Sequence, residues 1–508
     1  MSNADNHPVA ERGSADERTC TFNGRSHSPR QAGVASALPL LLALLASAGS
    51  PSCAPQQVAE QVAARTPADL LVLGGTVVTM DPDHRVIPSG AVAVNDGAIV
   101  AVGSAAELGS SYDAAELLIP ADNDLVIPGL VNGHGHAAMS LFRGLADDMR
   151  LKEWLEGFIF PAEAELVDAD FVRVGTRLAA LEMIRTGTTT FADMYYFEDV
   201  VAEVTRQAGL RGVLGETVLD FPAPDNANVE EALAYSERFL QRWHGDPLIV
   251  PAVAPHAPTT TSPETLRRCA ELARAHGAPL LIHLAETRDE VNQIKQQFKV
   301  SPVQYLASLG FLGPDVIAAH LIWVDAADIR TLVASGTTAI HNPESNMKLA
   351  SGTMPLRRLR AAGILVGLGT DGAASNNDLD MFGAINAAAL LRKQVSADPS
   401  ALPAAEALAM ATIEGARALG LDTQIGSLEV GKRADIVVIS SDSPHQVPRY
   451  EPTSQIVYAT GGADVRATIV DGRILYRDGQ FNSLDSETIK AAAAALATRI
   501  TAATAARR

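Results

Sequence analysis

Short apolar runs, broken by glycine, asparagine and aspartate, fill two stretches near the ends of the chain. The first stretch, Ala68–Leu125, contains ADLLVLGGTVVTMD, AVAVNDGAIVAVG and ELLIPA. The second contains similar runs in three segments: Gly426–Ile439, Gln455–Gly461 and Val465–Gly479. Apolar runs between turn residues are typical of β-strands. Neither set makes a satisfactory domain alone, so we expect one small β-sandwich built from residues 67–125 and 421–485.

Between these stretches, over residues 126–420, apolar runs alternate with segments of helical periodicity. The clearest helical segments are Asp168–Arg185, Asn228–Trp243 and Ser262–His276. Such alternation is the signature of βαβ units around a parallel sheet. The apolar runs end near eight residues: His136, Asp193, Glu216, His256, His283, His320, His341 and Asp371. Eight units predict a (β/α)8 TIM-type barrel, an α/β fold whose active site lies at the carboxyl ends of its strands. The alanine-rich residues 486–508 predict a terminal helix.

Residues 1–66 predict a leader rather than a part of the fold. Arg25 and Arg30 precede the apolar run Val34–Ala48, which is too short to span a bilayer comfortably. The run ends in ASA, which fits a signal cleavage site, and Cys53 resembles a lipoprotein attachment cysteine. We expect export, with a periplasmic or lipid-anchored protein, and a cytoplasmic location if the segment is not a true signal. The long polar stretch before the apolar run argues against a signal.

The composition, with 47% hydrophobic and 19% charged residues, is that of a packed globular protein. The net charge of −19 argues against nucleic-acid partners and supplies no basic patch for anionic membranes. The three cysteines form no C-x-x-C pair, so any metal must be held by nitrogen and oxygen. The expected partner is a small-molecule substrate, and a homo-oligomer is left open. Membrane contact is expected only through an anchor at Cys53.

The stretch Asp124–His136, DLVIPGLVNGHGH, ends in two histidines two residues apart. Because residues i and i+2 of an extended segment share a face, His134 and His136 can converge on one ion. His283 and Asp371, at later strand ends, complete a site of three nitrogens and one carboxylate. Zn²⁺ tolerates this mixture and lowers the pKa of bound water to about 7, while Fe²⁺ is an alternative that the ligands do not exclude. Asp371 would also accept the proton of that water.

Two further residues at the same strand ends are candidates for chemistry. Glu286 lies three residues beyond His283. From there it could contact both the water and the substrate, or it could simply favour a helix N-terminus. His320 ends the apolar strand VIAAHLIWV.

These motifs resemble the amidohydrolase superfamily, in the branch that holds methylthioadenosine/S-adenosylhomocysteine deaminases and triazine hydrolases. The resemblance covers roughly Ala68–Gly479 and rests on PGLVNGHGHAAMSLFRGLADD, HLAET, AAHL, HNPESNMKLASG, GLGTDGAASNN and GSLEVGKRADIVVI. It implies four metal ligands: His134, His136, His283 and Asp371. It also implies that Glu286 is the proton shuttle and that His320 polarises or orients the attacking hydroxide and the substrate. No lysine ends the fourth strand, so one metal ion is implied rather than a pair bridged by a carbamylated lysine.

The same resemblance implies nucleoside contacts by Trp154 and Glu163, in KEWLEGFIFPAEAEL, and by His256, in APHAP. Relatives that accept a homocysteine tail often carry an arginine where this chain has Glu216. An acid there would repel the carboxylate of the tail. The sequence therefore favours methylthioadenosine or adenosine over S-adenosylhomocysteine as substrate.

The expected function is a metal-dependent hydrolytic deaminase of an adenine nucleoside. Metal hydroxide would attack the adenine carbon that bears the amine, and Glu286 would protonate the adjacent ring nitrogen and then the departing ammonia. A triazine or halo-heterocycle hydrolase and a deaminase of another purine or of a pterin are the alternatives. Glu163 and His256 favour a nucleoside, since a triazine has no ribose. A non-catalytic binding protein is a further alternative, against which the intact set of site residues argues.

Overall fold

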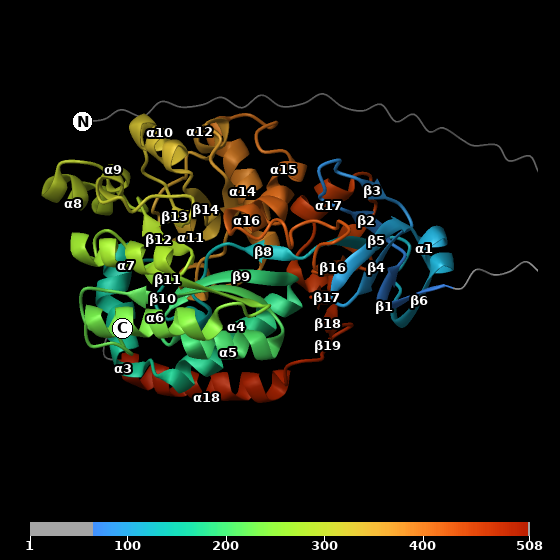
Figure 1. The fold of residues 1–508 in the computed structure, drawn as a ribbon, viewed down its shortest axis with the longest axis horizontal. Helices are drawn as coiled ribbons and strands as arrows, with labels where there is room; N and C mark the ends of the chain where they lie inside the picture. The colour runs from blue at the N-terminus through green and yellow to red at the C-terminus, as the bar shows by residue number, and fades with distance from the viewer. Residues whose placement is uncertain (1–64, 506–508) are drawn as a thin grey trace, which may run out of the picture. The chain divides into compact units, whose positions relative to one another are not determined.

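The computed structural model describes residues 65–505, and its central feature is an eight-stranded parallel sheet (Figure 1). The strands neighbour one another in chain order: β8 (Leu130–Asn132), β9 (Thr188–Tyr195), β10 (Arg211–Val218), β11 (Ile249–Pro255), β12 (Leu280–Leu284), β13 (Val316–His320), β14 (Thr338–His341) and β15 (Val366–Leu368). The backbone N–H of Gly133 donates to the carbonyl of Leu368 at 2.8 Å and so links the first strand to the last. The sheet is a nearly closed barrel, and the predicted (β/α)8 fold is confirmed.

Helices follow the strands around the barrel (Figure 1). The three sequence-predicted helices are confirmed. Each begins at a side chain, Asp168, Asn228 or Ser262, that accepts a hydrogen bond from the backbone N–H three residues on. From α4 onwards, the helices of the barrel region are α4 (Ala169–Arg185), α5 (Glu198–Ala208), α6 (Val229–Trp243), α7 (Pro263–Ala275), α8 (Arg288–Phe298), α9 (Pro302–Ser308), α10 (Ala326–Ser335), α11 (Pro343–Lys348), α12 (Leu356–Ala361), α13 (Ala373–Asn376), α14 (Met381–Ser396), α15 (Ala404–Met410) and α16 (Ile413–Ala418).

The connection after β8 is longer than a simple turn into α4. It consists of η1 (Ala137–Phe142), α2 (Leu151–Trp154), η2 (Leu155–Ile159) and α3 (Phe160–Leu166). The turn η2 is π-helical, a conformation that is rare and frequent at functional sites. This connection supplies one wall of the cavity described below.

Strands from both ends of the chain form two further sheets, and the predicted β-sandwich is confirmed. One sheet mixes the two ends in the order β19 (Gln480–Phe481), β18 (Arg473–Arg477), β17 (Val465–Val470), β16 (Ile436–Ile439), β7 (Leu125–Pro128), β2 (Thr76–Val78) and β3 (Val86–Ile87). The other is N-terminal, in the order β5 (Ala98–Ser104), β4 (Gly90–Asn95), β1 (Thr66–Leu73) and β6 (Tyr112–Leu118), with α1 (Ala105–Ser111) after β5. Val72 of one sheet and Val126 and Val438 of the other are fully buried in one shared core.

One predicted strand is wrong. The segment Gln455–Gly461 lies mostly in a helix, α17 (Pro452–Tyr458). The side chain of Glu451 accepts backbone N–H groups at the start of this helix, and proline at the first helical position favours it. The buried pair Ile456 and Val457 makes an apolar run too short to distinguish a strand from a helix. Two short 3₁₀ turns flank it: η3 (Pro444–Gln446) and η4 (Gly462–Asp464).

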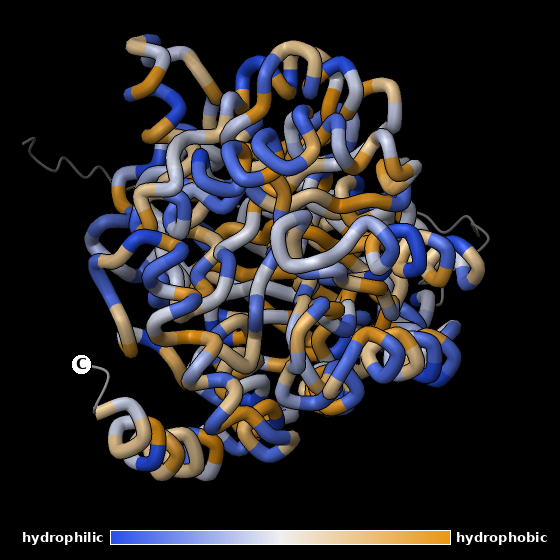
Figure 2. The backbone as a smooth tube through the Cα atoms, turned by 90° about the vertical axis from the view of Figure 1, so that its left-hand side faces the viewer, coloured by the Kyte–Doolittle hydropathy of each residue, from blue (hydrophilic) through white to orange (hydrophobic). Residues whose placement is uncertain are grey.

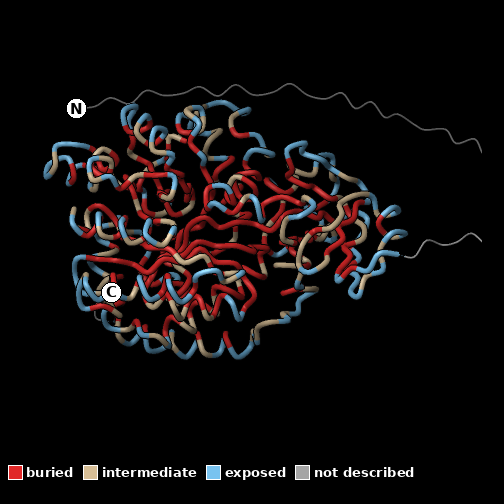
Figure 3. The backbone as a smooth tube through the Cα atoms, in the orientation of Figure 1, coloured by how far each residue is buried: buried red, intermediate tan, exposed pale blue. Residues whose placement is uncertain are grey.

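The hydrophobic residues concentrate on the barrel strands in the middle of the molecule, and the outer faces of the helices are exposed (Figures 2 and 3). The predicted terminal helix is confirmed as α18 (Ser486–Thr504), which buries Ile489, Ala493 and Ile500. Within residues 65–505, the structure contains no helix with the length and apolar character needed to cross a membrane. The apolar run at 34–48 and Cys53 lie outside the described residues, so the leader stays a prediction.

Candidate active site

The carboxyl end of the barrel brings the predicted metal ligands together. His134 and His136 follow β8, His283 lies in β12, and Asp371 follows β15. Their ligand atoms fall into two overlapping groups, each within 4.8 Å: one of His134, His136 and Asp371, and one of His134, His283 and His320. The structure therefore places His320 as close to the cluster as the predicted ligands, and its position alone does not separate a ligand from a neighbouring polarising group.

The hydrogen bonds of His136 and His283 fix which ring nitrogen faces the cluster. Nδ1 of His136 donates to the carbonyl of Met194 at 2.8 Å, and Nδ1 of His283 donates to the carbonyl of His256 at 2.8 Å. Nε2 is therefore the atom of each ring that faces the cluster, unprotonated when the ring is neutral, and these two atoms lie 3.4 Å apart. The buried Nε2 of His134 has no hydrogen-bond partner among the described residues. Lone pairs that face one another in this way fit a bound cation.

Asp371 supplies the negative charge of the cluster. Its Oδ1 lies 3.5 Å from Nε2 of His134 and 3.2 Å from Nε2 of His136. Its Oδ2 accepts a hydrogen bond of 2.7 Å from the hydroxyl of Ser345. Burial opposes ionisation of Asp371, but the neighbouring side chains of His134 and His136 outweigh burial and hold its pKa well below the usual range. Burial lowers the pKa of His134 to about 4, so this imidazole is neutral and able to bind a metal.

Glu286 and His320 face each other beside the cluster. Oε2 of Glu286 lies 3.7 Å from Nε2 of His320, and Oε1 accepts a hydrogen bond of 3.2 Å from Ser351. Burial raises the pKa of Glu286, which suits a group that must both take and give a proton near neutral pH. His320 is oriented from behind, because its Nδ1 donates to the side-chain oxygen of Asn346 at 2.9 Å.

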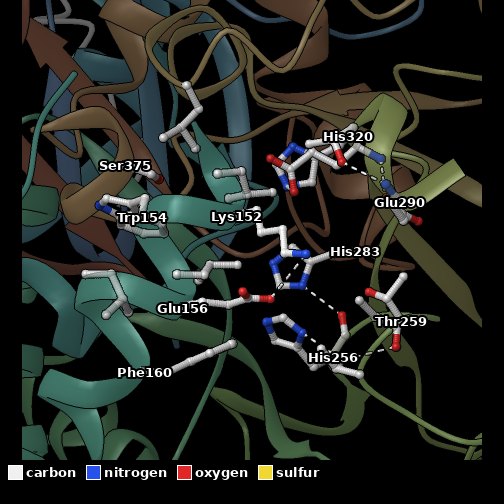
Figure 4. Close-up of a pocket in the computed structure, with 18 of the residues that line it drawn as sticks. Lys152, Trp154, Glu156, Phe160, His256, Thr259, His283, Glu290, His320 and Ser375 are labelled. Atoms are coloured by element: carbon white, nitrogen blue, oxygen red, sulfur yellow. Dashed lines mark hydrogen bonds and ion pairs between the residues drawn. The ribbon is translucent and has the colours of Figure 1, made fainter. Parts of the chain in front are cut away.

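A cavity of about 550 Å³ opens in front of these groups, and Figure 4 shows part of its lining. Trp154, Glu163 and His256, the residues expected to contact a nucleoside, all line it. The hydroxyls of Tyr195 and Tyr196 donate to the two oxygens of Glu163, at 2.8 and 3.3 Å. Burial raises the pKa of Glu163 to about 7 in spite of these donors.

Glu216 does not join the site. This side chain is completely buried and lies outside the set of described residues that line the cavity. Its oxygens accept hydrogen bonds from the backbone N–H of Glu198 at 3.1 Å and from the side chain of Asn226 at 3.0 Å. The next residue, Thr217, lines the cavity instead. The expected contact between Glu216 and a substrate tail has no support in this arrangement.

Three residues that hold the site from behind were not predicted from the sequence. Ser345, Asn346 and Ser351 fix Asp371, His320 and Glu286, and all three lie in the motif HNPESNMKLASG. That motif was the available signal, because small polar residues after a barrel strand are placed to hydrogen-bond the site. Two more supporting groups carried no such signal: the tyrosines that bind Glu163, and Glu290, whose carboxylate accepts the backbone N–H groups of Ala285 and Glu286.

Comparisons with known proteins agree on one group of relatives. Residues 125–475 match the model of the Amidohydrolase family. The chain is 48% identical over 422 residues to a 5-methylthioadenosine/S-adenosylhomocysteine deaminase of Syntrophobacter fumaroxidans, covering 83% of this chain and 96% of that protein. It is 44% identical over 424 residues to a 5'-deoxyadenosine deaminase of Methanosarcina mazei, covering 83% and 96%. The crystal structure of an adenosine deaminase from Xanthomonas campestris with bound zinc has a TM-score of 0.85 at 38% identity, covering 86% of this chain and all of that one.

Proposed function

Because the chain belongs to the amidohydrolase family, we propose that it is a metal-dependent hydrolytic deaminase of an adenine nucleoside. The reaction replaces the exocyclic amine of the base with oxygen and releases ammonia. The observation that carries the proposal is that Glu286 and His320 face each other, 3.7 Å apart. Both line the cavity and lie beside a histidine cluster that could hold a metal ion. The deaminase names of the similar proteins support a nucleoside as substrate.

One divalent cation, Zn²⁺, is the proposed cofactor. His134, His136, His283 and Asp371 would hold it, and the zinc in the similar adenosine deaminase structure supports the choice of metal. A bound zinc ion supplies a Lewis acid that activates water for attack on the ring carbon. The side chains of the protein orient the base and transfer the protons.

Glu286 is the proposed proton carrier. Its raised pKa lets it take a proton from the attacking water and deliver it to the ring nitrogen beside the reacting carbon. The same carboxylate then takes the second proton from the hydroxyl that has been added to the ring carbon and delivers it to the amine, which leaves as ammonia while the carbon–oxygen bond becomes a carbonyl. His320, held by Asn346, directs its Nε2 towards the same position, where it orients the attacking water.

Glu163 is the proposed ribose contact. Each of its carboxylate oxygens already accepts one tyrosine hydroxyl and keeps a lone pair for a second donor. A ribose offers two neighbouring hydroxyls that match these two acceptors. This arrangement favours a nucleoside over a triazine, which has no such diol.

An ammonia-release screen of the purified, metal-analysed protein tests the proposal. The panel holds adenine nucleosides, guanine, pterins and triazines. We expect release from adenine nucleosides only, with one equivalent of metal per chain. Release from triazines or pterins alone would contradict the substrate class, and two metal equivalents that are both needed for activity would contradict the single-ion site.

A further inference from the structure

We propose that Glu290 is a positioning residue, which aligns Glu286 for proton transfer by holding the backbone turn that carries it. The inference rests on the proposed function and names a further residue that its reaction needs. Glu290 lies in the first turn of α8 and is labelled among the cavity residues in Figure 4. Its Oε1 accepts the backbone N–H of Ala285 at 2.8 Å, and its Oε2 accepts the backbone N–H of Glu286 at 2.7 Å. The carboxylate therefore bridges two successive N–H groups of the turn between β12 and α8.

Capping of α8 does not by itself explain this bridge. The helix begins after Thr287, whose side chain accepts the backbone N–H of Glu290 at 3.1 Å. In a capping box, a glutamate at the third helical position returns the bond to the N–H of the capping residue. Glu290 reaches further back instead, to Ala285 and Glu286. Its carboxylate thus ties the turn that carries the proton carrier to the start of α8.

The turn needs support because its backbone is strained. Ala285 has a φ of +53°, a left-handed conformation that is unfavourable for a residue with a Cβ. Such a conformation persists only where the surrounding structure holds it. The carbonyl of Ala285 accepts the N–H groups of Ile322 and Trp323, which follow β13, at 3.0 and 2.9 Å. Glu290 supplies the corresponding bonds on the N–H side.

The position of this turn sets where the side chain of Glu286 points. The carboxylate of Glu286 lies 3.7 Å from Nε2 of His320 and accepts a hydrogen bond of 3.2 Å from Ser351. A misplacement of about 1 Å at a reacting group can cost about 10²-fold in rate. Because both hydrogen bonds of the Glu290 carboxylate go to this turn, its effect on the rate should act through Glu286.

Two variants of Glu290 separate the bridge from its charge. Glu290→Gln keeps the shape but replaces one acceptor oxygen with an NH₂ group, which cannot accept a hydrogen bond. Glu290→Asp keeps the charge but is one methylene too short to bridge both N–H groups. In the full-length, metal-replete protein with adenosine as substrate, both should lower kcat about 10-fold. Metal content and KM should stay close to the native values.

The matched control is Glu264→Gln. Glu264 is an exposed acid in the first turn of α7, the helix before α8, and lies outside the described lining of the cavity. Its replacement removes the same charge from the same position of a helix, and kcat should not change. Native kcat in Glu290→Asp would show that the charge matters rather than the bridge, and so would overturn the inference. A raised KM with native kcat, or a loss of metal, would also overturn it, because Glu290 would then bind substrate or support the metal site.

A double variant tests whether Glu290 acts through Glu286. In a protein that already carries Glu286→Gln, the added change Glu290→Gln should lower kcat by less than about 2-fold, because the positioned group no longer transfers protons. A residue that supported the fold in general would cause its full loss again, about 10-fold, and this result would overturn the inference.

The outcomes also separate this inference from the function on which it rests. Native kcat in both single variants of Glu290 overturns the inference and leaves the proposed function intact. Failure of the native protein to deaminate any adenine nucleoside overturns the proposed function, and this inference with it.

Discussion

Glu286 and Asp371 are both buried carboxylates beside the histidine cluster, but their partners differ. Asp371 lies within 3.5 Å of two histidine nitrogens, whereas Glu286 faces His320 and Ser351. Asp371 is therefore placed to hold the cation, and Glu286 is placed to act on the substrate. Replacing each carboxylate with the amide of the same shape separates the two tasks.

Glu286→Gln should retain its metal and lose kcat by about 10²–10⁴-fold, because an amide cannot carry a proton between water and the base. Asp371→Asn should lose metal as well as activity, since its carboxylate would be a ligand. Metal content and kcat of both variants, measured under one condition, check this. A metal-free Glu286→Gln protein, or one with native turnover, would show that the proton carrier has been misidentified.

The residues show how far sequence can locate a site. The i, i+2 spacing of His134 and His136, together with the places of His283 and Asp371 at later strand ends, predicted that these residues meet. Glu216 shows the limit. A strand end fixes how deep a residue lies, but successive side chains of a strand point to opposite faces. Thr217 points to the cavity face of β10 and Glu216 to the opposite face. Because every residue of this strand is buried, its sequence has no alternation of apolar and polar residues from which the face of each side chain could be predicted.

At the scale of elements, β10, α5 and the loop before α6 meet at a group of buried acids. Burial, and then repulsion from Asp225, raise the pKa of Glu216 well above its ordinary value. Its neighbour Glu198 is shifted in the same direction by burial and by Asp193. As pH rises, these two carboxyl groups therefore lose their protons at a lower pH in the unfolded chain than in the folded protein.

Glu216→Gln should make the melting temperature less sensitive to pH. A raised carboxyl pKa stabilises the fold fully below the unfolded pKa of about 4.5, and this contribution is lost as pH rises towards the folded pKa. The Tm of the variant relative to the native protein should thus increase as pH rises above about 5. Glu237→Gln, an exposed residue on α6, is the control. Parallel Tm curves for the Glu216 variant and the native protein would contradict the shift.

The helical elements were predictable where a cap and a long apolar period coincided. Asp168, Asn228 and Ser262 marked helix starts that the structure reproduces. The strand predicted at residues 455–461 was wrong, because two adjacent buried residues fit either a strand or one helical turn. The π-helical turn at 155–159 had no sequence signal at all, since its extra residue per turn leaves no distinct pattern in so short a segment.

At the scale of the whole molecule, the two chain ends meet in one sheet while the barrel between them carries the site. Val126 pairs with Val438 across β7 and β16, so residues more than half the chain apart share a register. The repeat of short apolar runs at both ends predicted this arrangement. The arrangement of the barrel strands followed from their number and parallel alternation.

The export leader expected over residues 1–66 stays a prediction, but its end is corrected, because Thr66 already belongs to strand β1. The apolar run at 34–48 and its ASA end predict a native N-terminus near Gly49, or a lipid on Cys53. Mass spectrometry of the protein isolated from its own cells measures this directly. Recovery of the intact leader on protein from the cytoplasm would refute export.

The central claim is hydrolytic replacement of the adenine amine, and its most direct measurement is the mass of the product formed in water enriched with heavy oxygen. The metal-replete protein should convert an adenine nucleoside into a product that has lost its amine and gained one heavy oxygen on the base, with the bond between base and sugar intact. Free adenine, or an unlabelled base in the product, would contradict the account, and so would recovery of unchanged nucleoside across the whole adenine panel.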